Sequence, residues 1–219
     1  DSAKNQFMIL INHELKTPLT TIISFASLMK ETLLSDEQKL FTDRIVKSSE
    51  KLKSIIDDVL LIVKSEIGRI QAKSDIIKPD WLLKDLPPEI LSSTNAKNQT
   101  IRLMSQLETL ELDPQLTKTA FLRALHNATK FGLAGREILI HIIPNNKGRF
   151  QINIENEGPQ ISQKAIEKII KPFQLDENIM NHSIGMGLGL TICQSLMKAQ
   201  RGYLEVVNTD NGVKVILNF

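Results

Sequence analysis

The sequence predicts an α+β protein in which an N-terminal helical hairpin precedes an α/β sandwich. Apolar residues recur at steps of three or four over residues 3–34 and again over 36–71, a spacing typical of amphipathic helices. After residue 73, short β-like runs alternate with helical stretches, an order typical of sandwiches of sheet and helices. We therefore expect a helical domain at residues 1–73 and a second domain at 74–219.

The first helix is expected over residues 3–34, which contain no glycine and a single proline, Pro18. A turn follows, and either Ser35 or Asp36 would cap the second helix, because both side chains can accept hydrogen bonds from free backbone N–H groups. The apolar stripe of this second helix extends to about Gln71. The two helices would form a hairpin.

Two helices packed only on each other cannot cover both apolar stripes. Leaving eight large apolar side chains in water, at about 1.5–3 kcal/mol each, would forfeit on the order of 12 kcal/mol, which is comparable to the stability of a whole domain. A second copy of the hairpin would bury them in a four-helix bundle, so we expect a homodimer. Packing of the hairpin onto the C-terminal domain is the alternative that the sequence leaves open.

The elements of the second domain are expected from short runs of β-branched residues and from helical periodicity. Strands are expected at residues 101–104, 137–143, 150–154 and 213–217, and helices at about 114–130, 162–170 and 188–198. The turn residues Asp210-Asn211-Gly212 predict that the chain closes with a hairpin.

Composition excludes several classes of protein. Lys and Arg number 27 against 25 Asp and Glu, a net charge of +2 that argues against a nucleic-acid-binding protein. No run of about 18 apolar residues occurs, so we expect no contact with a membrane within this stretch. The single cysteine, Cys193, excludes an internal disulfide framework and a cysteine-based zinc cluster. Because helical pattern begins almost at residue 1, we expect a piece of a longer protein.

A histidine and a carboxylate adjoin on the polar side of the first helix. His13 lies about 120–200° around the helix from the apolar stripe, so we expect it to be exposed. An imidazole nitrogen becomes nucleophilic when the other ring nitrogen donates to a carboxylate, and Glu14 could be that base. Pro18 removes a backbone donor close by and can bend the helix. Taken alone, such a pair is usually ordinary solvated surface.

Polar residues also follow one face of the helix expected at 114–130. Arg123, Asn127 and Lys130 fall at positions i, i+4 and i+7, opposite the apolar Phe121 and Leu125. An amide oxygen and an ammonium group on one face suit a hydrated Mg²⁺ ion and the phosphates that it bridges. A polar surface stripe is the alternative.

Two further stretches carry a polar group or glycines where a ligand could approach. Strand alternation places Asn156 on the same side as Ile154, ahead of the turn residues Gly158-Pro159. Such an inward amide could bind the edge of a base, or it could cap the turn. Further on, Gly185-Met186-Gly187-Leu188-Gly189 opens a helix, where backbone amides can approach phosphate.

In this order and at this spacing, the motifs resemble those of the sensor histidine kinases of two-component systems. His13-Glu14-Leu15-Lys16-Thr17-Pro18-Leu19 resembles the phosphoacceptor motif, and Asn127-Ala128-Thr129-Lys130-Phe131 resembles the asparagine box. Gly158-Pro159 stands where the first glycine box belongs. Pro172-Phe173 is similar to the phenylalanine motif, and Gly185 to Leu190 are similar to the second glycine box. The resemblance extends over essentially the whole chain. It implies that the chain is a cytoplasmic piece of a longer, membrane-tethered sensor protein.

The resemblance implies a dimeric four-helix bundle joined to an ATP-binding sandwich of the gyrase and histidine kinase type. By resemblance, His13 would accept the γ-phosphoryl group of ATP and Glu14 would act as the general base. The phosphoryl group would then pass to an aspartate on the receiver domain of a response regulator. Thr17 matches the position that orients water for dephosphorylating this partner aspartate.

The resemblance also implies a nucleotide site. Asn127 would hold Mg²⁺, Lys130 would contact the phosphates and Phe131 would lie near the nucleotide. The remaining expected contacts are Asn156, Gly158, Ile161, Gly185, Met186, Gly187, Leu188 and Gly189.

Two departures from the family pattern leave an alternative function open. Asn156 stands where the family usually has an aspartate that accepts from the adenine amino group, which would weaken ATP binding about five- to tenfold. Gln160 replaces a glycine, and its side chain could crowd the rim of the pocket. The alternative is a partly degenerate kinase that acts mainly as a dimeric scaffold or as a response-regulator phosphatase. A chaperone- or gyrase-like ATPase is disfavoured, because such proteins lack the phosphoacceptor hairpin.

Overall fold

The computed structural model describes residues 2–145, 148–170 and 187–219, with side chains at 14–145, 148–167 and 189–219. The chain divides into two compact units, Asp1–Ile67 and Gly68–Phe219. The domain boundary expected after Lys73 lies a few residues further along and stays a prediction.

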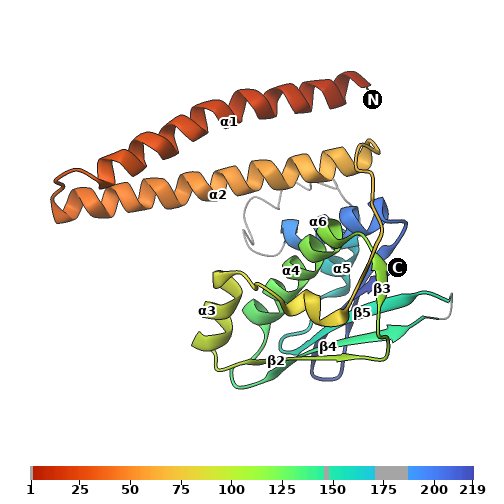
Figure 1. The fold of residues 1–219 in the computed structure, drawn as a ribbon. Coiled ribbons are helices and arrows are strands. Elements are labelled where there is room, and N and C mark those ends of the chain that lie inside the picture. Colours follow the sequence, from red (N-terminus) through yellow and green to blue (C-terminus); the bar gives the residue numbers. More distant parts are fainter. Residues whose placement is uncertain (1, 146–147, 171–186) are drawn as a thin grey trace. The chain divides into compact units, whose positions relative to one another are not determined.

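The first unit is an antiparallel helical hairpin of α1 (Ser2–Lys30) and α2 (Asp36–Glu66) (Figure 1). Of the two candidate caps, the structure selects Ser35: its Oγ accepts from the Gln38 N–H at 3.3 Å, and the Gln38 Oε1 accepts from the Ser35 N–H at 2.9 Å. Helix α2 ends before the expected Gln71, because Gly68 adopts a left-handed conformation with φ of 66° that a helix cannot continue.

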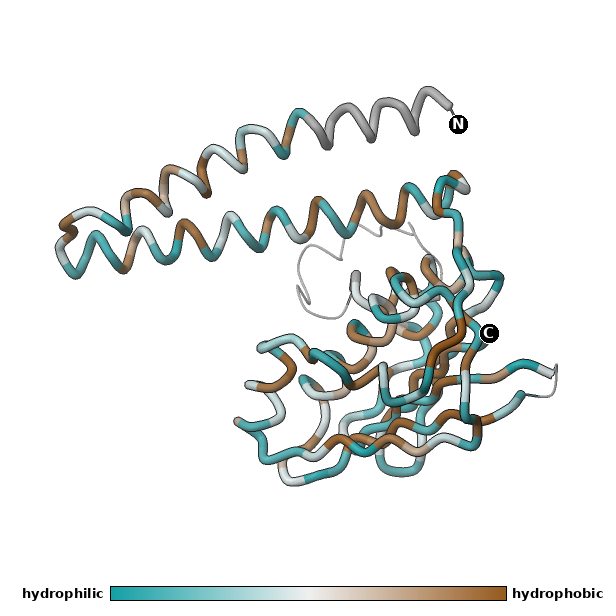
Figure 2. The backbone as a smooth tube through the Cα atoms, in the orientation of Figure 1, coloured by the Kyte–Doolittle hydropathy of each residue, from teal (hydrophilic) through white to brown (hydrophobic). Residues whose placement is uncertain are grey.

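Contacts between α1 and α2 bury only part of their apolar surface. Lys16 forms an ion pair with Asp57, and the Lys30 Nζ lies 2.7 Å from the Asp43 Oδ1. Figure 2 shows hydrophobic residues recurring along both helices, and many of their large apolar side chains remain exposed. These exposed side chains are Leu15, Ile22, Phe25, Leu28, Met29, Leu40, Phe41, Ile45 and Leu52, and Leu33 is exposed in the turn between the helices. Another apolar surface is needed to cover them.

The second unit contains a five-stranded sheet with the strand order β2-β4-β5-β7-β6. Strands β2 and β4 are parallel, and the other neighbours in the sheet are antiparallel. A separate ribbon pairs β1 with β3. The bounds of the strands are β1 Asp75–Ile77, β2 Thr100–Ser105, β3 Leu110–Leu112, β4 Glu137–Pro144, β5 Phe150–Glu157, β6 Tyr203–Asn208 and β7 Gly212–Asn218.

Helices cover one face of this sheet (Figure 1). Their bounds are η1 Pro79–Leu83, a 3₁₀ helix, then α3 Pro88–Ala96, α4 Pro114–Phe131, α5 Gln163–Ile170 and α6 Gly187–Ala199. Helix α4 packs against α6 and against β5, and the fully buried Phe121 and Leu125 face this core together with Ile140 and Ile152. The arrangement confirms the predicted α+β class of a helical hairpin followed by a sandwich. Within the described residues, no helix is both long enough and apolar enough to cross a membrane.

The start of α4 is fixed by a buried carboxylate. Asp113 caps the helix, its Oδ1 accepting from the Leu116 N–H at 2.9 Å, while its Oδ2 accepts from the Lys73 N–H at 2.6 Å. The Gln200 Oε1 accepts from the Thr117 hydroxyl at 3.0 Å, which joins the same turn to the end of α6. These hydrogen bonds hold the helix whose later turns carry Asn127.

Candidate functional site

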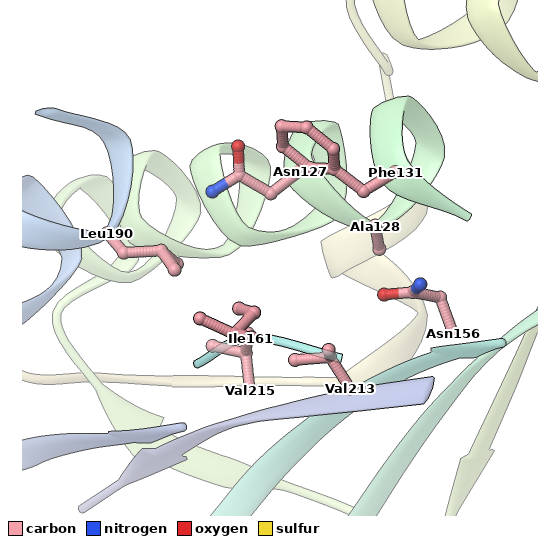
Figure 3. A pocket seen from close by; sticks show the side chains of 8 residues that line it. All are labelled: Asn127, Ala128, Phe131, Asn156, Ile161, Leu190, Val213 and Val215. Carbon is pink, nitrogen blue, oxygen red and sulfur yellow. The ribbon is translucent and has the colours of Figure 1, made fainter. Parts of the chain in front are cut away.

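A hollow opens in the second unit between α4, the start of α6, the end of β5 and β7 (Figure 3). Six apolar side chains and two amides make up its described lining: Asn127, Ala128, Phe131, Asn156, Ile161, Leu190, Val213 and Val215. An apolar wall with a few polar groups suits a flat, partly apolar ligand.

Asn156 is the polar group at the strand side of the hollow. The residue is only 8% exposed, and its Nδ2 donates to the Glu157 carbonyl oxygen at 3.2 Å. Figure 3 shows the side-chain oxygen of Asn156 directed into the hollow. Strand alternation predicted this inward position, and the Oδ1 can accept a hydrogen bond from an N–H group of a ligand.

Asn127 is the polar group on the helix side. It is half-buried, and Figure 3 shows it on α4 beside Phe131. A Cβ added at Gly189, in the first turn of α6, would lie 3.5 Å from the Asn127 Nδ2 and 3.9 Å from its Oδ1. The absence of a side chain at Gly189 therefore leaves room beside the amide. An amide oxygen with free space next to it can serve as a ligand of a hard cation.

Basic side chains lie on the same turns of α4 as Asn127. The pKa of His126 lies below its ordinary value, first because of burial and then because of the charges of Lys130 and Arg123, with Glu89 acting in the opposite direction. The Lys130 Nζ lies 5.2 Å above the centre of the Phe131 ring. Lys130 is exposed and does not itself line the hollow, but its charge is available to an anion at the mouth.

Gly158 supports the site without lining it. A Cβ at this position would lie 2.6 Å from the Phe131 carbonyl oxygen, so only glycine allows the end of β5 to approach the end of α4 this closely. The Gly158 N–H donates to the Asn211 carbonyl oxygen at 2.9 Å.

The expectation that Gln160 crowds the rim is not met. Its Nε2 donates to the Thr209 carbonyl oxygen at 2.8 Å, and the neighbouring Ile161 N–H donates to the Asn208 Oδ1 at 2.9 Å. These bonds hold Gln160 against the β6–β7 hairpin, and it is not among the residues that line the hollow.

The other predicted site residues fall in different places. Gly187 and Leu188 begin α6, while Gly185 and Met186 lie outside the described residues, as do Pro172-Phe173. His13 belongs to α1 of the first unit, where Glu14 and Thr17 are exposed one turn or less away. The Thr21 hydroxyl donates to the Thr17 carbonyl oxygen at 3.1 Å, next to Pro18, which cannot donate to the Glu14 carbonyl oxygen.

Four lining residues were missed from the sequence: Ala128, Leu190, Val213 and Val215. Val213 lies directly opposite Asn156 in the antiparallel register of β5 and β7. The alternation of Val213 and Val215 on one face of a strand was a usable signal, but only the register of the two strands shows that this face meets Asn156.

The chain thus consists of a helical hairpin that carries a histidine, followed by a sandwich domain with a hollow lined by apolar side chains and two amides. Two family models match the chain, "His Kinase A (phospho-acceptor) domain" at residues 3–68 and "Histidine kinase-, DNA gyrase B-, and HSP90-like ATPase" at residues 112–219. Together they cover most of the sequence. The chain belongs to the sensor histidine kinases of two-component systems, and it comprises both parts of their catalytic core.

Similar proteins include both curated relatives and a solved structure. The hybrid signal transduction protein dokA of Dictyostelium discoideum is 29% identical over 94% of this chain, which spans 13% of that protein. The sensor protein VanSC of Enterococcus gallinarum is 23% identical over 97% of this chain, which spans 60% of that protein. The crystal structure of full-length ShkA in complex with AMPPNP has the same fold, with a TM-score of 0.82 and 24% identity over 97% of this chain and 45% of that one. The chain therefore spans only part of the length of these relatives.

Proposed function

We propose that this chain binds ATP together with Mg²⁺ in the hollow and transfers the γ-phosphoryl group to His13. The observation that carries the proposal is the buried Asn156. Its side-chain oxygen is directed into a hollow whose lining, among the described residues, is largely apolar. Adenine presents an exocyclic amine on a flat ring, so it matches an acceptor within such a wall. The complex of ShkA with AMPPNP, an ATP analogue, supports the same choice of ligand.

Different residues around the hollow would contact the base, the metal ion and the phosphates of the nucleotide. Ile161 and Val213 would contact the base, and Asn156 would accept from its amine. The room beside Asn127 fits Mg²⁺, which would neutralise charge on the phosphates. Lys130 and the backbone amides at the start of α6 would contact the phosphates. The full set of proposed nucleotide-binding residues is Asn127, Lys130, Phe131, Asn156, Gly158, Ile161, Gly185, Met186, Gly187, Leu188 and Gly189.

The transfer step uses the first unit. A ring nitrogen of His13 attacks the γ-phosphorus, the bond from that phosphorus to the bridging oxygen breaks, and ADP leaves. Glu14 accepts a hydrogen bond from the other ring nitrogen and stabilises the positive charge that develops there. The phosphoryl group then passes to an aspartate of a response-regulator receiver domain, and Thr17 orients the water that removes it again.

The assembly and location follow from the same proposal. The exposed apolar faces of α1 and α2 support a homodimer in which two hairpins form a four-helix bundle. ATP and response regulators are cytoplasmic, so we place this part of the protein in the cytoplasm.

Asn156 also supports a second candidate, a partly degenerate kinase that acts as a dimeric scaffold or as a response-regulator phosphatase. A neutral amide gives a weaker hydrogen bond to the adenine amine than a carboxylate would. In that case the chain would dephosphorylate a receiver domain while incorporating little phosphate itself.

Incubation of the full chain with Mg²⁺ and γ-labelled ATP tests the proposal. Wild type is expected to gain acid-labile phosphate, and His13→Ala to lose it while binding ATP as wild type does. His141→Gln, on β4 and away from the hollow, serves as the matched histidine control and should keep the label. Labelling retained by His13→Ala would overturn the assignment, and an unlabelled wild type that dephosphorylates a receiver domain would favour the second candidate.

A further inference from the structure

Lys97 directly follows α3 and extends its ammonium group to the end of a different helix, α4. Its Nζ donates to the carbonyl oxygens of Thr129, Lys130 and Gly132 at 3.1, 2.5 and 3.0 Å. Carbonyl groups in the last turn of a helix lack donors within the helix, and the helix dipole favours a positive charge there. One half-buried ammonium group therefore satisfies three acceptors where α4 ends.

The turn that Lys97 holds is also part of the wall of the hollow. Phe131 and Ala128 line the hollow from this turn, and Asn127 lines it from the residue before. Lys97 is not itself among the lining residues. Its Nζ contacts the backbone of the turn that carries these lining residues.

Further hydrogen bonds join the segment after α3 to the segment after α4. The Gln99 Nε2 donates to the Leu133 carbonyl oxygen at 3.1 Å, and the Gly135 N–H donates to the Lys97 carbonyl oxygen at 2.8 Å. The hydrogen bond from Gly135 thus fixes the backbone of Lys97, while the side chain of Lys97 binds the end of α4.

The same turn touches the strand side of the hollow. The Leu133 N–H donates to the Glu157 carbonyl oxygen at 2.9 Å. A Cβ added at Gly132 would lie 3.5 Å from the Asn156 Cβ, so the two backbones are in close contact. A shift of the end of α4 would therefore change the distance between the helix wall and Asn156.

We propose that Lys97 is a positioning residue for nucleotide binding, which holds the last turn of α4 so that Asn127 and Phe131 face Asn156 across the hollow. The inference rests on the proposed function, since it assigns a role in binding the same nucleotide. Lys97 acts through the backbone of α4 and does not touch the ligand.

Lys118 provides a matched control on the same helix. Its Nζ also donates to three carbonyl oxygens, those of Trp81, Leu82 and Lys84, at 3.1, 2.8 and 2.6 Å. The acceptors belong to η1 and the residue after it, none of which lines the hollow. Loss of Lys118 should therefore cost stability as loss of Lys97 does, with no effect on the ligand.

The test compares Lys97→Met, Lys97→Arg and Lys118→Met in the full chain by calorimetric titration with ATP and Mg²⁺, below the melting temperature of every variant. Lys97→Met should weaken binding about tenfold, as when an outer partner of a ligating group is removed. Lys97→Arg, which keeps the charge and the donors, should recover much of the affinity. Lys118→Met should bind like wild type. If Lys97→Met does not fold, Lys97→Gln takes its place and should also bind more weakly.

Binding by the Lys97 variant within twofold of wild type, or an equal loss in Lys118→Met, would overturn the inference. The side-chain amide signals of Asn127 and Asn156 in the nitrogen–proton NMR spectrum give a second readout without ligand. The chemical shifts of these signals should change in Lys97→Met and be unchanged in Lys118→Met. The reverse pattern would again overturn the inference. A wild type that binds no ATP would contradict the proposed function instead, and the amide signals would still decide the positioning role.

Discussion

The substitution Asn156→Asp should strengthen ATP binding and weaken the fold at the same time. The side-chain oxygen that faces the hollow becomes part of a carboxylate, which accepts a stronger hydrogen bond from the adenine amine. The Nδ2 that donates to the Glu157 carbonyl oxygen at 3.2 Å becomes an oxygen, so that carbonyl keeps only the Leu133 N–H, at 2.9 Å, as a donor and faces a negative charge. The gain in affinity arises at the side-chain oxygen, and the loss of stability arises at the position of the side-chain nitrogen.

The gain in binding free energy and the loss in the free energy of unfolding are of similar size. A hydrogen bond to a charged group contributes about 1.5–3 kcal/mol against about 1 kcal/mol for a neutral one. A gain of about 1 kcal/mol corresponds to roughly fivefold tighter binding. The loss at the Glu157 carbonyl, together with burial of a charge in a residue that is 8% exposed, should lower the free energy of unfolding by about 1–3 kcal/mol.

Titration calorimetry with ATP and Mg²⁺, and denaturant unfolding without them, measure the two effects separately. Asn153→Asp is the matched control, because Asn153 is a buried amide on the same strand, accepts from the Gln151 Nε2 at 3.0 Å and does not line the hollow. It should destabilise the fold without changing ATP affinity. Unchanged or weaker binding by Asn156→Asp, with the control unaffected, would refute the assignment of Asn156 to the base.

Three further predictions address the charges, the core and the assembly. Burial, and after it the charges of Lys130 and Arg123, lower the pKa of His126. A saturating ATP analogue should raise that pKa, because phosphate charge offsets the two cations; an unchanged pKa in an NMR titration would place the phosphates elsewhere. Burial raises the pKa of the Cys193 thiol to about 12, so a disulfide reagent at neutral pH should modify it only on unfolding, and rapid labelling of the native protein would contradict this. Phe25→Asp, on the exposed face of α1, should weaken the dimer on the order of tenfold or more in sedimentation experiments, and undiminished dimer would argue for a different interface.

The features predicted correctly from the sequence are those that depend on neighbouring residues. Helical spacing gave the hairpin, and capping chemistry narrowed the start of α2 to two residues, of which Ser35 is the cap. Strand alternation correctly placed Asn156 on the buried face of β5. The motif around Asn127 lay on a helix, as its periodicity indicated.

The features that were missed depend on contacts between residues far apart in the chain. Strands β1 and β3 are three residues each, too short to show alternation. The strand register that sets Val213 against Asn156 cannot be derived from either strand alone. The bonds from Lys97 to α4 join residues more than thirty positions apart, and a lone lysine after a short helix gives no local sign of them.

Mapping the phosphoryl group on the intact chain tests whether His13 is the residue that receives it. After incubation with ATP and Mg²⁺, the protein would be digested at neutral pH, where phosphohistidine survives, and the fragments sequenced by mass spectrometry with electron-transfer dissociation. We expect phosphate on His13 and on no other residue of the chain. Phosphate on a different side chain, or steady ATP hydrolysis with no phosphorylated residue, would contradict it.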